Sequence, residues 1–212
     1  ASHASDWKPC GPCVCSRPIL VRSADPNGSV SFARVAAQAP CDYGIAWTDY
    51  AHWNPPRPDE YRLGLARFVH QPGTLAGPSL VPMPTFPVDL VWGSGEFVAL
   101  AFRGPCTNDN CLLRIDEAME RVDGVVPIDL PFGTGRTNQL LFTGDRYLYV
   151  FTMATVPFVQ FRFLDFDLQP LGADVVVTAP DGGGPFRAVW TGERFGVAAV
   201  NWMDVRFYET DR

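Results

Sequence analysis

The sequence predicts an all-β fold, a four-bladed β-propeller with four antiparallel strands in each blade. Three observations support this prediction: a hairpin motif that recurs at intervals of about fifty residues, short apolar runs bounded by Gly and Pro, and an apolar segment near the N-terminus that can complete the last blade. We expect residues 17–212 to form one propeller domain, preceded by a cysteine-rich segment at residues 1–16.

The repeated motif is an aromatic residue, four residues that include glycine, and a second aromatic residue. It occurs at residues 92–97, 142–147 and 190–195, so the copies start 50 and 48 positions apart. A glycine-containing turn between two apolar runs is typical of a β-hairpin. Each motif is therefore expected to join the first two strands of a blade. A weaker copy lies at 41–47, where Tyr43 stands 54 positions before Phe97.

Apolar runs supply the other strands of each blade. The second strands are almost wholly apolar, as expected of strands covered on both faces, and are expected at 97–102, 147–152 and 195–200. The third strands are expected at 61–69, 111–115, 161–166 and 205–210, and the fourth strands at 73–81, 122–130 and 173–179. The blades then cover residues 30–82, 85–131, 137–180 and 185–212.

The last blade lacks a fourth strand, because the sequence stops just after the expected strand 205–210. The apolar segment 17–23 has no blade of its own. We expect it to pair beside strand 205–210, which would join the two ends of the ring and protect strand edges.

The pattern Trp-x-Gly-x-x-Phe, which stands at 190–195, is set between apolar strands that are followed by an Asp/Gly turn, and it resembles the propeller repeats of secreted and surface proteins of bacteria. The resemblance covers residues 17–212 and implies fold and extracellular location, with no catalytic residues. The blades carry neither a terminal Trp-Asp dipeptide nor the double glycine of kelch repeats. The segment 23–28 departs from a sialidase box by one extra residue and a missing Trp.

Charge and composition exclude several partners. The chain has a formal net charge of −6 and no cluster of Lys and Arg, so we expect neither nucleic acid nor an anionic membrane as a partner. No apolar run approaches the roughly 18 residues that cross a bilayer, so no membrane insertion is expected. The sequence contains no Gly-x-Ser-x-Gly or His-Glu-x-x-His motif, and we expect no cofactor.

Six cysteines, an even number, indicate disulfides and a secreted protein. Cys106 and Cys111 are five positions apart on an expected loop and can close a hairpin disulfide.

The other four cysteines are Cys10, Cys13, Cys15 and Cys41, which allow three pairings. A bond from Cys13 or Cys15 to Cys41 would fasten the N-terminal segment where the ring closes. The alternative is a zinc site made by Cys10, Cys13 and Cys15 with Cys41 or His3. Because an oxidising compartment favours disulfides, we expect no metal.

The loops after the second strands are expected to emerge on one face, at 48–60, 103–110, 152–158 and 201–204. Aromatic rings suit the C–H face of a sugar, and Asn and Asp can hydrogen-bond hydroxyl groups. The predicted ligand-binding residues are Asp49, Tyr50, His52, Trp53, Asn54, Asn201, Trp202 and Asp204. The simpler alternative is that Trp53 and Trp202 pack on blade edges. Trp47, Trp92 and Trp190 are expected to be packing residues.

These observations favour a secreted binding or interaction module that recognises carbohydrate or a protein, and they favour binding over catalysis. One alternative is a glycan hydrolase that uses Asp49, Asp109 and Asp204, which would have to converge within roughly 5–10 Å. The other is a structural surface protein without a small ligand. The sequence does not predict an oligomeric state.

Overall fold

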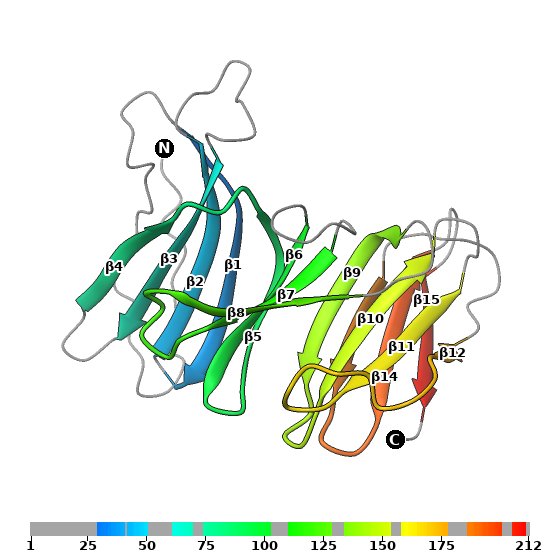
Figure 1. Cartoon of the computed structure of the whole chain (residues 1–212). Coiled ribbons are helices and arrows are strands. Elements are labelled where there is room, and N and C mark those ends of the chain that lie inside the picture. The colour runs from blue at the N-terminus through cyan, green and yellow to red at the C-terminus, as the bar shows by residue number, and fades with distance from the viewer. Residues whose placement is uncertain are drawn as a thin grey trace, which may run out of the picture.

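A computed structural model describes residues 29–40, 42–50, 61–69, 74–102, 110–128, 134–153, 158–177, 186–200 and 205–210. These residues form four antiparallel sheets that follow one another along the chain (Figure 1), and within each sheet every strand pairs with the next one in sequence. Within the described ranges there is no helix of the length and apolarity that a membrane-spanning segment needs.

The first two sheets contain four strands each. Sheet 1 is made of β1 (Ser29–Ala39), β2 (Asp42–Tyr50), β3 (Tyr61–Val69) and β4 (Thr74–Val81). Sheet 2 is made of β5 (Phe86–Gly93), β6 (Glu96–Phe102), β7 (Asn110–Ile115) and β8 (Val122–Pro127).

The other two sheets continue the pattern. Sheet 3 is made of β9 (Thr134–Phe142), β10 (Tyr147–Met153), β11 (Val159–Leu164) and β12 (Val175–Val177). Sheet 4 is made, in the described residues, of β13 (Phe186–Trp190), β14 (Phe195–Val200) and β15 (Val205–Thr210). The predicted all-β organisation in antiparallel sheets is confirmed. The segment 17–23 lies outside the described residues, so its pairing with β15 stays a prediction.

The hairpin motif has the same register in three sheets. Its two aromatic residues lie directly opposite each other on the first and second strands, as Trp92 with Phe97, Phe142 with Tyr147 and Trp190 with Phe195. Their ring centroids are 4.7, 5.0 and 4.5 Å apart. In sheet 1 the corresponding pair is Ala37 and Tyr43. Trp47 is buried, and Trp92 and Trp190 pack against the core, which confirms their expected packing role.

The core lies between successive sheets. One buried cluster joins sheets 1 and 2, a second joins sheets 2 and 3, and a third joins sheets 3 and 4. The aromatic residues of each hairpin also contact the preceding sheet: the Tyr147 hydroxyl of sheet 3 donates to the Gly93 carbonyl of sheet 2 at 2.8 Å. Stacking of sheets along the chain thus buries both faces of the second strands.

The first strands of the sheets adjoin one another in chain order. β1 contacts β5, β5 contacts β9, and β9 contacts β13. Residues that are far apart in sequence therefore come together along this row of first strands.

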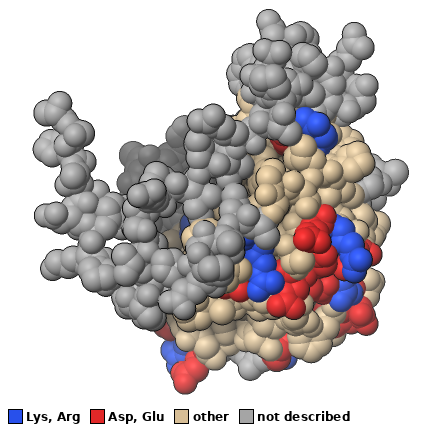
Figure 2. Space-filling model, turned by 90° about the vertical axis from the view of Figure 1, so that its left-hand side faces the viewer, with Lys and Arg blue, Asp and Glu red and all other residues tan. Residues whose placement is uncertain are grey.

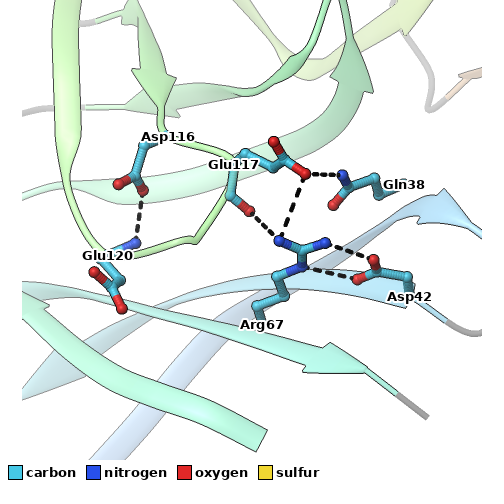
Figure 3. A network of polar contacts seen from close by, with 6 residues as sticks. All are labelled: Gln38, Asp42, Arg67, Asp116, Glu117 and Glu120. Carbon is cyan, nitrogen blue, oxygen red and sulfur yellow. Dashed lines mark hydrogen bonds and ion pairs between the residues drawn. The ribbon is translucent and has the colours of Figure 1, made fainter. Parts of the chain in front are cut away.

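Charged side chains of both signs lie together on the surface that Figure 2 shows. On the part of the surface in Figure 2 that is coloured by charge, basic and acidic side chains lie beside one another instead of forming a patch of one sign. Arg67 of β3 donates to both carboxylate oxygens of Asp42 at 3.0 and 2.7 Å, and it also reaches Glu117 in the β7–β8 turn (Figure 3). This group therefore ties sheet 1 to sheet 2.

Candidate functional site

Most of the ligand-binding residues predicted from the loops lie outside the described part of the chain. These are His52, Trp53, Asn54, Asn201, Trp202 and Asp204, together with Asp109 of the hydrolase alternative. Cys10, Cys13, Cys15, Cys41 and Cys106 also lie outside it, while Cys111 is buried on β7. The predicted disulfides and the roles of these residues stay predictions.

Asp49 and Tyr50 correct one expectation, because they belong to β2 and not to a loop. Both are buried, and Asp49 is 0% exposed. Asp49 accepts a hydrogen bond from Arg62 of β3 at 2.8 Å, while the Tyr50 ring packs against Tyr61 with centroids 5.0 Å apart. Polar residues at 48–50 suggested a loop, but pairing with β3 continues to Tyr61. Asp49 is therefore a buried strand residue paired with Arg62, and its expected position on a loop is wrong.

A different set of polar residues occupies one equivalent position in all four sheets. Counting back three residues from the first position of each hairpin pair reaches Arg34 on β1, Asp89 on β5, Gln139 on β9 and Arg187 on β13. We call these four residues the first-strand cluster. Each lies opposite an apolar residue of the second strand: Ala46, Leu100, Val150 and Ala198.

Three members of the cluster bind the next first strand. The Arg34 Nε donates to the carbonyl of Val88 on β5. The Asp89 Oδ2 accepts the backbone N–H of Leu140 on β9 at 2.9 Å. The Gln139 amide donates to the Ala188 carbonyl and accepts its N–H, at 2.9 and 2.8 Å. The cluster therefore joins the four sheets from β1 to β13.

Bulges in the first strands support this geometry. The pairing register shifts between Ser31 and Arg34 on β1 and between Pro87 and Asp89 on β5. A bulge leaves a residue outside the regular ladder. Val88, the extra residue on β5, supplies the carbonyl that accepts from Arg34.

Asp89 is the acidic member of the cluster, and its surroundings have opposite effects on its pKa. Burial raises its pKa above the ordinary value, whereas the N–H groups of Leu140 and Leu90 and the charges of Arg187 and Arg34 favour its ionised form. Asp89 therefore lies within the electrostatic range of arginines from sheets 1 and 4.

Arg187 differs from the other three members. Its side chain is exposed, and within the described part of the chain it makes no hydrogen bond or ion pair. Gln139, by contrast, is 9% exposed and is held by Ala188. The N–H donors of the Arg187 guanidinium are therefore exposed, and the next residue along β13, Ala188, is held by Gln139.

Phe32 adds an aromatic ring two residues before Arg34. It lies in the β1 bulge with φ of 53°, a left-handed conformation that is uncommon for a residue with a bulky side chain. Its ring is 50% exposed, and the ring centroid lies 5.3 Å from that of Phe86 on β5. Strained backbone of this kind is often found at binding sites.

The first-strand cluster was missed by sequence reasoning, although a signal for it exists. Asp89, Gln139 and Arg187 are polar residues that stand three positions before the first aromatic residue of the hairpin motif. Superposing the three clear repeats on that motif puts Asp89, Gln139 and Arg187 in one column. The turn of the first repeat is one residue longer, so the same alignment reaches Val35, and Arg34 follows only from the pairing of β1 with β2.

Comparisons with known proteins bear on the fold. No family model matches the chain, and no curated protein matches it. Among solved structures, a family 117 glycoside hydrolase from the marine bacterium Zobellia galactanivorans is similar, with a TM-score of 0.50 and 13% sequence identity. The match covers 87% of this chain and 66% of the hydrolase chain, slightly less than two thirds of its length. At this identity the likeness concerns the fold alone.

Proposed function

We propose that the protein is a secreted carbohydrate-binding module whose site is the first-strand cluster with Phe32. The observation that carries the proposal is the half-exposed Phe32 ring, which packs on Phe86 and stands two residues before Arg34, a polar group held by the neighbouring strand. Sugar sites combine an aromatic face with a few fixed polar groups. The six cysteines and the resemblance to surface propeller repeats support the extracellular location.

The proposal includes a ring of four blades, in which segment 17–23 completes sheet 4 and the predicted loops border the site. The positive charge of Arg187 on sheet 4 acts to lower the pKa of Asp89 on sheet 2, although sheet 3 lies between them in chain order. In a flat stack, sheets two places apart would be about 20 Å apart, beyond the roughly 8–10 Å over which exposed charges interact. This interaction supports a curved row of sheets.

Two exposed valines support closure of the ring between sheets 4 and 1. At the position after each cluster member, Leu90, Leu140 and Ala188 are buried against the preceding sheet, but Val35 of sheet 1 is 60% exposed. At the next position, Ala36, Val91 and Leu141 of sheets 1–3 pack in the cluster shared with the following sheet. Val189 of sheet 4, at the same position, is 52% exposed. The face of sheet 1 that carries Val35 and the face of sheet 4 that carries Val189 are thus both apolar and can pack against each other.

The test of carbohydrate binding is a glycan array followed by calorimetry with the oligosaccharide retained best. Replacing Phe32 by Ala should weaken that binding roughly five- to tenfold, because about 1 kcal/mol of ring contact is lost. Phe166→Ala is the matched control, since this ring is 45% exposed on the β11–β12 turn. Unchanged binding by Phe32→Ala, or an array without any retained glycan, would contradict the proposal.

A second candidate is glycan hydrolysis, favoured by the likeness to a glycoside hydrolase. Hydrolysis requires two carboxyl groups, and Asp49 cannot be one because it is buried in an ion pair. Asp89 is the acidic group at the site, but both of its oxygens accept backbone N–H bonds. We therefore propose carbohydrate binding ahead of glycan hydrolysis. Release of shortened sugars from a labelled oligosaccharide by the wild type, and not by Asp89→Asn, would establish hydrolysis instead.

A further inference from the structure

We infer that the sugar ligand carries an oxyanion, a carboxylate or a sulfate ester, which binds to Arg187 and Arg34. This inference rests on the proposed carbohydrate binding and names the ligand class for the same site.

The charges of the first-strand cluster leave a positive excess. Arg34 and Arg187 carry two positive charges, and Asp89 carries at most one negative charge. Burial disfavours the ionised form of Asp89, which increases the excess. The whole chain has a formal net charge of −6, so this positive site stands out from an acidic protein.

Arg187 is not the ion-pair partner of Asp89. The Asp89 Oδ1 accepts the N–H of Leu90 at 3.0 Å, and its Oδ2 accepts the N–H of Leu140 at 2.9 Å. Among the described residues, the ion pairs within 4 Å do not include one between Arg187 and Asp89. A guanidinium has five N–H donors, so a single bond to β1 in the closed ring, like that of Arg34 Nε to Val88, would still leave Arg187 two parallel donors for a carboxylate or sulfate.

Two backbone carbonyls fix the Arg34 side chain next to Val88, the residue before Asp89. Its Nε donates to the Val88 carbonyl, and its Nη1 donates to the Ala33 carbonyl at 2.8 Å. Both acceptors are neutral backbone groups, so the positive charge of Arg34 is not cancelled by them. A side chain fixed in this way loses little entropy when it meets a ligand.

The test compares three oligosaccharides of equal length by calorimetry: a neutral galactan, an oligogalacturonate and a sulfated galactan. We expect the two acidic probes to bind at least about tenfold more tightly than the neutral one. Comparing the oligogalacturonate with the sulfated galactan identifies whether the site prefers a carboxylate or a sulfate. Arg187→Gln should lower the affinity for the acidic probes about tenfold and lower that for the neutral probe by a clearly smaller factor, because only the acidic probes pair with its charge. Arg194→Gln, at the hairpin of the same sheet, should change neither affinity.

The outcomes separate the two levels of the proposal. Binding of the neutral probe as tight as that of both acidic probes would overturn the oxyanion inference and leave carbohydrate binding intact. Equal losses for Arg187→Gln and Arg194→Gln would also overturn it, because they would indicate unspecific charge attraction. Absence of binding by all three probes and on the array would overturn both.

Discussion

Gly44 and Gly93 are residues on which the packing between sheets depends. A Cβ atom on Gly44 would lie 2.5 Å from Cε1 of Phe97, and one on Gly93 would lie 2.5 Å from the Phe142 ring. In both cases the ring belongs to the next sheet. The missing side chains create the space that these aromatic residues fill.

Replacing Gly44 by Ala should therefore destabilise the fold by about 1–3 kcal/mol, the usual range for overpacking a tight core. Gly124→Ala is the control, because a Cβ on this strand glycine would lie at an ordinary 3.4 Å from Arg114 Cδ. It should change stability by less than about 1 kcal/mol. Urea unfolding of both variants gives the comparison, and equal stabilities would show that the Phe97 ring has room to move.

Asp89 should make stability depend on pH. Its folded-state pKa is raised above the ordinary 3.8, so between these two values the folded protein holds a proton that the unfolded chain has lost. Stability therefore falls as pH rises through this window, by linkage. Relative to Asp89→Asn, the wild type should lose stability from about pH 4 upward until the folded-state pKa is passed. Urea unfolding from pH 3.5 to 7 measures the difference, and a constant or oppositely sloped difference would refute the expectation.

The residue scale was also where sequence reasoning succeeded least. Trp47, Trp92 and Trp190 could be assigned to the core because each lies within a local apolar pattern. Arg34 and Arg187 are 153 positions apart, and only the stacking of four sheets brings both near Asp89. A relation of that kind is invisible until the repeats are superposed.

At the scale of the elements, one ion-pair position recurs with changing partners. The residue before the second aromatic of the hairpin faces the third strand, as Asp42 with Arg67 and Glu96 with Arg114. In sheet 4 the signs are reversed, and Arg194 lies 3.6 Å from Glu209. In sheet 3 the corresponding pair is Arg146 over the ring of Phe163, at 5.8 Å from the centroid. The geometry of the hairpin is kept while its chemistry varies.

Arg67 should contribute more to stability than an ordinary surface arginine. It makes two hydrogen bonds to Asp42 and contacts Glu117 of the next sheet, and its pKa is raised chiefly by the bond to Asp42 (Figure 3). Arg67→Gln should cost about 1 kcal/mol in the free energy of unfolding, because a bidentate pair is lost. Arg121→Gln, whose side chain is 72% exposed, should cost less than about 0.5 kcal/mol. Equal costs would mean that solvent screens both arginines alike.

Strands and turns were predictable because their signals are local. The expected strand 61–69 matches β3, and 205–210 matches β15. The expected strand 161–166 was two residues late, because Asp165 begins a turn by accepting the N–H groups of Asp167 and Gln169. Polar residues at 48–50 misled the prediction in the other direction, since cross-strand pairing outweighs local polarity.

For the whole molecule, closure of the ring can be tested by a buried charge. Val35→Asp should destabilise the protein by several kcal/mol if sheet 4 covers sheet 1, because an unpaired carboxylate would be buried. Val176→Asp is the control, since Val176 is 53% exposed on β12, the last strand of sheet 3. Thermal unfolding of the two variants decides the matter: equal midpoints would mean that Val35 faces solvent and that the row of sheets is open.

Each junction in the row of first strands uses a different kind of bond. A guanidinium meets a carbonyl between β1 and β5, a carboxylate meets an N–H between β5 and β9, and an amide meets both groups between β9 and β13. On the receiving strand, each bond is made to a backbone group, which every strand presents whatever its side chains are. A junction therefore depends on a polar side chain in one repeat and makes no demand on the residues of the next. A gene with the second and third repeats exchanged should for this reason still form bonds between its first strands, and the order of the sheets is set by the continuity of the chain.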